Sequence, residues 1–230
     1  MKCGVITFPG SNCDEDMAHV LGTVMGLPVE RLWHKDRDLK GSDLVVLPGG
    51  FSYGDHLRSG AIARFSPIMD AVAAHAAAGG LVLGVCNGFQ VLCEAGLLPG
   101  ALLPNAGQRF ICRNVLVRKA TGRTAITRAV PDLPLRIPIA HGEGRYHADA
   151  DTLKALSEGD QVIFRYCDAE GRITDDANPN GSAEHIAGIC NAGRNVFGMM
   201  PHPERAADER LGNTDGLHLF ASLVEAAVTA

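Results

Sequence analysis

The sequence GGLVLGVCNGFQVLCEAG, residues 79–96, restricts the fold more than any other part of the chain. A strand-forming run at residues 81–85 ends at a cysteine and an asparagine held between glycines. An apolar helical pattern begins at once, over residues 88–95. A buried strand that turns directly into a helix is the repeating unit of proteins with parallel sheets. The segment therefore predicts an α/β fold with an open, mostly parallel sheet.

The first half of the chain repeats this alternation. Apolar runs predict three further strands, at residues 3–8, 29–34 and 44–47. Helical spacing predicts one helix at residues 14–25 and another that starts with Ser66 as N-cap and Pro67 in the first turn. Such units place helices on both faces of the sheet. The glycine-bearing loops PGSN, PGGFSYGD and GVCNG would then gather at the carboxyl ends of the strands, where ligands bind in this architecture.

The second half of the chain has a different pattern. Turn-rich segments separate the strands expected there, at residues 110–118, 135–140 and 162–166. A hairpin is expected from residues 186–190 and 196–199, and a final amphipathic helix from residues 215–228. These strands would be antiparallel additions to the sheet. No segment has the composition of a linker, so the sequence predicts a single domain over residues 1–230.

Composition excludes several classes of protein. The net charge of −5 and the lack of basic clusters argue against nucleic-acid binding. No apolar stretch is long enough to span a membrane, and the start of the chain does not have the pattern of a signal peptide. The seven cysteines include no C-x-x-C pair, which favours reduced thiols in the cytoplasm over a zinc or redox centre.

GVCNG, residues 84–88, fits the nucleophile elbow, with cysteine in the place of serine. The turn from strand to helix is tight, so a side chain on either flanking residue would collide with its neighbours. Cys86 would lie at the start of a helix, where the positive helix end favours a thiolate. Alternatively, Cys86 is a buried cysteine in an ordinary turn. A second feature has to decide between the two.

The second feature is MMPHPER, residues 199–205. Prolines favour extended backbone here, and in an extended segment His202 and Glu204 point to the same side. Glu204 can then fix the tautomer of His202, whose other nitrogen is free to exchange protons with a thiol and a leaving amine. A solvated surface turn is the alternative. Together with the elbow, the motif supplies nucleophile, base and orienting carboxylate.

In LVVLPGG, residues 44–50, two glycines without side chains follow the strand. The N–H of Gly50 can stabilise a developing oxyanion, and the amide of Asn87, directly after the nucleophile, is the natural second donor. By itself the Gly49–Gly50 pair would be only a turn.

These residues resemble the class I, or triad, glutamine amidotransferases, through PGG, GVCNGFQ and PHPE. Further motifs narrow the resemblance to the glutaminase subunits of phosphoribosylformylglycinamidine synthase. They are FPGSNCDED, LPGGFSYGDHLRSGAIA, RFICR, IPIAHGEGRY, NPNGS and GMMPHPER. The resemblance runs nearly from end to end; only residues 119–134 match no motif.

The resemblance implies a role for each matching residue. Cys86 would form a glutamyl thioester, His202 would transfer protons and Glu204 would orient His202. Gln90, one turn into the helix, would help to hold the glutamine substrate. Ammonia would pass to a large synthetase subunit that uses ATP and Mg²⁺, with a small third subunit bridging the two. No cofactor or metal is expected in this chain.

Two motifs have no assigned role. His141 and Glu143, in AHGEGRYH, are expected near the rim of the site, at an ammonia exit or a partner interface, unless they belong to a simple polar turn. A metal site formed by His141 and His147 is disfavoured because no further ligands accompany them. The loop GDHLRSG is expected to cover glutamine or face a partner, although it has the composition to bind phosphate.

Two other functions stay open on the sequence alone. One is a different cysteine hydrolase on the same scaffold, such as a protease or a deglycase-like enzyme. The other is a catalytically silent interaction domain. The run CNGFQ and the distant H-x-E motif favour the amidotransferase, and an intact Cys, His and Glu set argues against silence.

Overall fold

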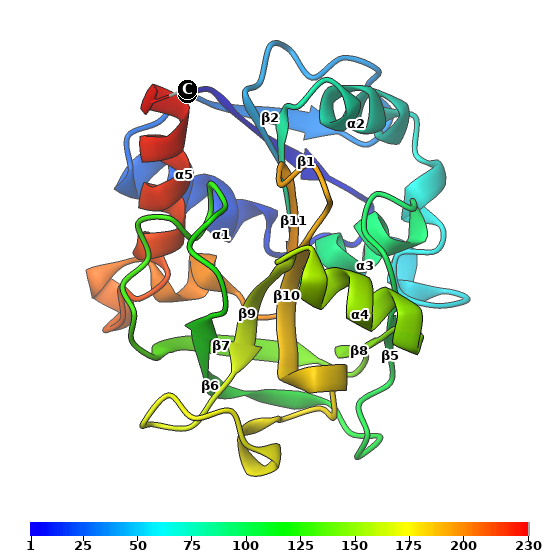
Figure 1. Cartoon of the computed structure of the whole chain (residues 1–230). Coiled ribbons are helices and arrows are strands. Elements are labelled where there is room, and N and C mark those ends of the chain that lie inside the picture. The colour runs from blue at the N-terminus through cyan, green and yellow to red at the C-terminus, as the bar shows by residue number, and fades with distance from the viewer. Residues whose placement is uncertain (230) are drawn as a thin grey trace.

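The computed structural model describes residues 1–229, and its centre is a sheet of nine strands (Figure 1). Five strands pair in parallel: β1 (Cys3–Thr7), β2 (Val29–Trp33), β3 (Leu44–Leu47), β4 (Leu81–Val85) and β11 (Val196–Met199). Nearly every side chain of β1, β3, β4 and β11 is buried. Such continuous apolar strands are typical of a parallel sheet with both faces covered.

Four antiparallel strands extend the sheet from β11. They are β10 (Ile186–Cys190), β9 (Val162–Tyr166), β6 (Ile111–Lys119) and β7 (Leu135–His141). The complete strand order is β2-β1-β3-β4-β11-β10-β9-β6-β7. The predicted hairpin is confirmed, because Ile189 pairs with Gly198 across the turn between β10 and β11.

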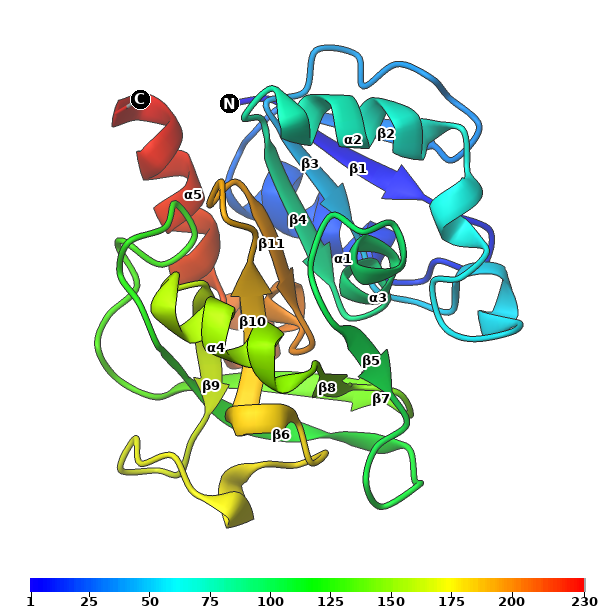
Figure 2. The ribbon, with the colours of Figure 1, turned by 45° about the vertical axis from the view of Figure 1, so that its right-hand side comes forward.

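Helices cover both faces of the sheet, as Figures 1 and 2 show. One face carries α1 (Asp14–Ala18) and α5 (Leu217–Thr229). The other carries α2 (Ile68–Ala77), α3 (Asn87–Glu94) and α4 (Ala150–Glu158). A single apolar cluster joins the parallel and antiparallel parts. The predicted fold class, an open α/β sheet with antiparallel additions, is confirmed.

The edge strand β7 lies against the end of the central strand β11. Figure 2 shows β6 and β7 running crosswise near the lower ends of β4 and β11. The backbone N–H of His202, which follows β11, donates to the carbonyl of Pro138 in β7, at 2.8 Å. Twist accumulates along a sheet, and here β7, the last strand in the order, contacts the segment that follows β11. The carboxyl ends of the parallel strands therefore face β7 and the loop that follows it.

Two details of the expected helices were wrong. The helix at residues 14–25 is α-helical only to Ala18 and continues as a π-helical segment, His19–Val24, in which the N–H of Met25 donates to the carbonyl of Val20 at 2.9 Å. Ser66 does not cap α2, since its hydroxyl lies 3.0 Å from the Tyr53 hydroxyl. A tertiary contact has taken the side chain that the local pattern assigned to the helix end.

Two strands and one α-helix were not expected from the sequence. The strands β5 (Ala101–Leu103) and β8 (Arg145–His147) form a separate antiparallel pair. The third element is α4, where the Asp149 side chain accepts a hydrogen bond from the backbone N–H of Thr152 at 2.8 Å. Within residues 1–229, no helix combines the length and the hydropathy needed to cross a bilayer.

Candidate active site

Cys86 lies at the turn between β4 and α3, with φ 50° and ψ −107°. A positive φ is unfavourable for a residue that has a Cβ, so the cysteine is held in a strained conformation. The flanking glycines are required by close packing. A Cβ on Gly84 would lie 2.7 Å from the backbone of Gly88, and one on Gly88 would lie 1.9 Å from the carbonyl oxygen of Leu47. The turn thus has the geometry that a nucleophile elbow needs.

His202 and Glu204 form a buried pair after β11, with 2.6 Å between Nδ1 and Oε1. A carboxylate only accepts, so Nδ1 carries the proton and Nε2, which has no protein partner, is the free nitrogen. One expectation was wrong: Glu204 belongs to a 3₁₀ turn, Pro203–Ala206, and not to an extended segment. The turn brings the carboxylate under the imidazole that precedes it.

The structure brings His202 and Cys86 together, although more than a hundred residues separate them. Burial opposes protonation of His202, but Glu204 and the Cys86 sulfur raise its pKa well above the ordinary value. Gly49 makes room for the ring, since a Cβ there would lie 2.6 Å from His202 Cε1. The Cys86 sulfur also lies 3.9 Å from the carbonyl oxygen of Ala140. Cysteine, imidazole and carboxylate therefore form one contiguous site.

The two predicted oxyanion donors flank the cysteine. Gly50 lines the same pocket as Cys86. It has φ 145°, and a Cβ there would lie 2.8 Å from the backbone of Ser11 and Asn12, so the position requires glycine. Asn87 is the first residue of α3, where a backbone N–H has no helical carbonyl to bind. The oxyanion role of these two amides stays a prediction.

The side chains of Asn87 and Gln90 form a buried network beneath the pocket. Asn87 Nδ2 donates to Gln90 Oε1 at 2.9 Å, and Gln90 Nε2 donates to the backbone carbonyl of Glu143 at 2.5 Å. Asn87 Oδ1 accepts hydrogen bonds from the backbone N–H and the hydroxyl of Ser52. Gln90 also lines the pocket. The network fixes two loops, which follow β3 and β7, against the start of α3.

The pocket beside Cys86 has a volume of about 140 Å³. The loop after β3 contributes Asp55 and Ser59, and the end of β7 with its following loop contributes His141 and Glu143. Both motifs that sequence reasoning left without a role therefore border the pocket. The His141 ring is buried, and burial, together with the charge of His202, lowers its pKa to about 4. His141 is thus the neutral imidazole of this site and His202 the basic one.

Cys13 is a residue of the site that sequence reasoning missed. Its sulfur, with atoms of His202 and Glu204, forms a group within 4.8 Å, and Arg205 Nη2 donates to the sulfur at 3.0 Å. Such a triplet can ligate a cation, but Glu204 is already engaged by His202 and an arginine occupies the other side of the sulfur. The sequence signal for Cys13 is the motif FPGSNCDED, which contains it.

Comparison with known proteins connects this geometry to a family. A model of the CobB/CobQ-like glutamine amidotransferase domain matches residues 1–215. Phosphoribosylformylglycinamidine synthase subunit PurQ of Synechocystis sp. is 59% identical and aligns with 95% of this chain and 98% of its own length. The same subunit of Koribacter versatilis is 56% identical, with 98% of each chain covered.

Solved structures agree with these matches. A chain in the structure of PurLQS from Thermotoga maritima superposes with a TM-score of 0.87, at 41% identity and with 98% of each chain covered. A glutamine amidotransferase of the same organism superposes with a TM-score of 0.55 at 17% identity, over 99% of this chain and 92% of that one. The second likeness extends to the fold alone.

Proposed function

The chain belongs to the CobB/CobQ-like glutamine amidotransferase domain family, and we propose that it is the glutaminase subunit of a phosphoribosylformylglycinamidine synthase. It hydrolyses the side-chain amide of glutamine and delivers ammonia for purine biosynthesis. The proposed amide hydrolysis rests on one observation: the buried His202–Glu204 pair lies beside Cys86, which is held in a strained turn. This arrangement supplies a nucleophile and a proton carrier at one point.

The reaction proceeds through a thioester. The Cys86 thiol passes its proton to His202 Nε2 and the sulfur attacks the amide carbon of glutamine, while the N–H groups of Gly50 and Asn87 stabilise the oxyanion. His202 Nε2 gives a proton to the leaving nitrogen, so ammonia departs and the glutamyl group stays on sulfur. His202 then takes a proton from the attacking water, which releases glutamate and restores the thiol. Glu204 holds the imidazole in the tautomer that both steps need.

Use of the released ammonia requires partner subunits. The match to a chain of PurLQS supports assembly with a large synthetase subunit and a small bridging subunit. We place ATP and Mg²⁺ on the synthetase subunit. The seven cysteines are free thiols, which supports a reaction in the reducing cytoplasm.

The decisive variant is Cys86→Ala in the complex reconstituted with both partner subunits. Amidine formation with glutamine should be lost, whereas amidine formation with an ammonium salt should survive. Loss of both activities would mean that Cys86 serves folding or docking and would contradict the assignment.

Covalent labelling separates the competing functions. A glutamine-mimicking diazoketone should label Cys86, and glutamine should block the label. Cys112, an exposed thiol, is the internal control and should stay unmodified. Labelling that glutamine does not compete would indicate another cysteine hydrolase, and no labelling would indicate a silent domain.

A further inference from the structure

The Glu204 carboxylate is fully buried and has a single charged partner. Its side chain is 0% exposed, and Oε1 lies 2.6 Å from His202 Nδ1. The other oxygen, Oε2, is buried without a hydrogen-bond partner. Within residues 1–229, Glu204 forms an ion pair with His202 only. A buried charge is costly unless an opposite charge lies close to it.

His202 supplies this opposite charge during only part of the proposed reaction. The ring is positive after it has taken the proton of the Cys86 thiol or of the attacking water. Before each of these steps the ring is neutral, because Nε2 must be free to accept the proton. The buried carboxylate therefore needs a second cation, one that keeps its charge throughout the reaction.

Arg205, the last residue of the motif GMMPHPER, is placed to supply this charge. Its Nη2 donates to the Cys13 sulfur at 3.0 Å, and that sulfur lies within 4.8 Å of atoms of His202 and Glu204. Burial opposes the arginine charge, but three neighbouring groups raise its pKa, namely Cys13, Asp16 and Glu204. A guanidinium does not lose its proton in proteins, so its charge is permanent.

Two contacts with the start of α1 hold the guanidinium in place. Asp16 Oδ2 accepts from Arg205 Nε at 3.0 Å, and the Cys13 sulfur accepts from Nη2. Cys13 is fixed in turn, because its backbone N–H donates to the carbonyl of Gly49 at 3.3 Å. A Cβ on Gly49 would lie 3.1 Å from the Cys13 sulfur, so this glycine leaves room for the thiol. Arg205 cannot turn away from the pair without losing both contacts.

Arg205 differs from the other cations that border the cavity behind Glu204. This cavity has a volume of about 660 Å³ and is also lined by His19 and Arg210. Both of these side chains contact the Asp208 carboxylate, each at 2.8 Å, which compensates their charge. On its other sides the pair faces two further titratable groups, Cys86 and His141. Among these groups, Arg205 is the one whose cation is directed at the Cys13 sulfur beside the pair.

We propose that Arg205 is a positioning residue that compensates the charge of Glu204 whenever His202 is neutral. The inference rests on the proposed function, because it concerns the proton exchange of the His202–Glu204 pair. A permanent positive charge opposes protonation of the pair. His202 Nε2 therefore becomes free at a lower pH than it would without Arg205. Glu204 fixes the tautomer of the ring, and Arg205 limits how firmly the ring holds its second proton.

The test follows the alkylation of Cys86 by iodoacetamide in the full chain as a function of pH, which needs neither glutamine nor turnover. Mass spectrometry of the peptide that contains Cys86 separates it from the other thiols. Loss of one proton from the site makes the sulfur reactive, and a nearby positive charge favours that loss. Arg205→Gln should therefore move the pH of half-maximal rate upward by about one unit. Arg205→Lys keeps the charge and should move it by less than half as much.

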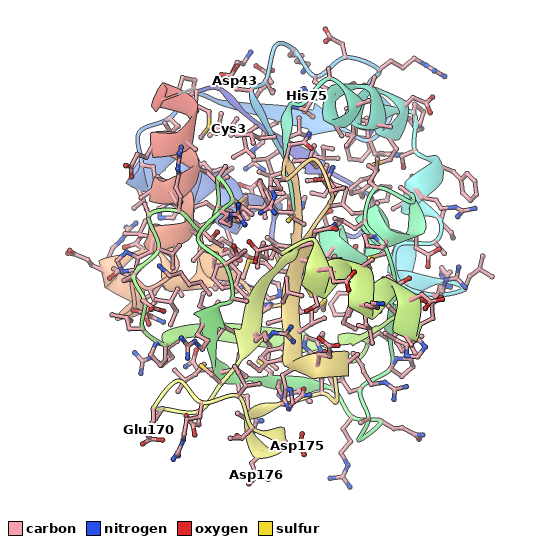
Figure 3. The ribbon with its side chains drawn as sticks, in the orientation of Figure 1. Cys3, Asp43, His75, Glu170, Asp175 and Asp176 are labelled. Carbon is pink, nitrogen blue, oxygen red and sulfur yellow. The ribbon has the colours of Figure 1, made fainter. Side chains whose placement is uncertain are left out.

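Two other arginines control for the loss of positive charge alone. Arg210 borders the same cavity, but its side chain is 74% exposed and is paired with Asp208. Arg172 pairs with Glu170, which lies at the lower end of the molecule in Figure 3. Solvent and salt screen both of these charges. Arg210→Gln and Arg172→Gln should therefore be alkylated at Cys86 like the unmodified chain.

A second variant keeps the test decisive if Arg205→Gln does not fold. Glu204→Gln removes the carboxylate charge that Arg205 is proposed to compensate. The double variant Glu204→Gln/Arg205→Gln should then resist urea better than Arg205→Gln alone, because no buried carboxylate is left without a cation. A double variant that is no more stable than the single one would show that Arg205 serves packing, and overturns the inference.

The outcomes separate this inference from the function on which it rests. An unchanged alkylation profile in Arg205→Gln overturns the inference, and so does an equal shift in Arg205→Lys. In the complex with both partner subunits, the acid limb of kcat/KM for glutamine should move with the alkylation profile, and a limb that stays in place also overturns it. The expected alkylation shift, without release of ammonia by the unmodified complex, would leave the role of Arg205 standing and contradict the glutaminase assignment.

Discussion

At the residue scale, the site contains two histidines in opposite electrostatic environments. His202 is paired with Glu204 and lies beside the Cys86 sulfur, which raises its pKa. His141 donates to a neutral amide oxygen, and burial lowers its pKa to about 4. The two rings thus differ in charge state: His202 favours the protonated form, and His141 stays neutral.

Glu204→Gln tests the first of these environments. The amide is nearly the same size, but it removes the charge that favours imidazolium and permits the wrong tautomer. We expect kcat with glutamine to fall about 10²- to 10⁴-fold and the pKa of His202, followed by NMR, to decrease. Activity with an ammonium salt in the complex should not change. An unchanged kcat would show that His202 needs no orienting carboxylate.

His141 should make stability depend on pH. Its folded-state pKa, about 4, lies below the ordinary value of about 6.5, so the unfolded chain binds the proton more readily. The stabilisation is present above pH 6.5 and is lost as the pH falls toward 4. We expect His141→Asn to have a lower free energy of unfolding than the unmodified chain at pH 7. At pH 5 this difference should be smaller by about 2 kcal/mol.

Urea unfolding at both pH values measures this difference. His147→Asn removes an exposed histidine close in sequence and is the control. If the stability difference between the unmodified chain and His141→Asn is the same at pH 5 and pH 7, His141 does not titrate in the way the structure indicates.

At the element scale, the contact of α3 with β3 and β4 sets the position of the nucleophile. The helix begins directly over the end of β3, and only bare glycines allow this approach. Gly88→Ala would ordinarily favour a helix by up to about 1 kcal/mol. Here the added Cβ would lie 1.9 Å from the Leu47 carbonyl oxygen, so the clash decides the sign.

We therefore expect Gly88→Ala to lower the free energy of unfolding by about 3 kcal/mol. Gly107→Ala is the matched control, because a Cβ there meets nothing within 4 Å, and its effect should stay within about 0.5 kcal/mol. Chemical denaturation of the two variants measures the comparison. Equal stabilities would show that helix and strand are not locked at this distance.

Elements with a clear period could be predicted from the sequence, and elements fixed by tertiary contacts could not. The buried strands β1, β3 and β4 and the hairpin of β10 and β11 have uninterrupted apolar runs. The strands β5 and β8 are three residues each, too short to show a period, and they depend on pairing such as that of Leu102 with Tyr146. The helix α4 did have a local signal, the Asp149 cap, which went unused.

The residues of the site divide in the same way. Cys86, His202 and Glu204 stand in motifs whose spacing carries a mechanism, and the structure brings them together. Asp55 and Cys13 were not singled out, because nothing local indicates that their loops fold over the end of β4. The positions of these loops depend on tertiary contacts, which the local sequence pattern does not show.

At the scale of the whole molecule, the site depends on both parts of the sheet. The parallel part supplies Cys86 from β4, and the antiparallel edge supplies His141 from β7 and the support of His202 at Pro138. One apolar cluster continues through both parts. The proposed single domain over residues 1–230 should therefore unfold as a unit.

Two probes in different parts of the sheet test this cooperativity. Trp33 reports on the parallel edge by fluorescence, and pulse alkylation of the buried thiol of Cys190 reports on β10. In a urea titration, the two midpoints should coincide. Alkylation of Cys190 at urea concentrations that leave Trp33 fluorescence native would show that the antiparallel part opens on its own.

The strained backbone at Cys86 has a consequence for how the sequence is selected. The chain places a thiol on a residue whose conformation glycine would adopt more easily. A sequence chosen only for durability would not keep cysteine at this position. In the proposed function, this position gives up some stability in exchange for turnover.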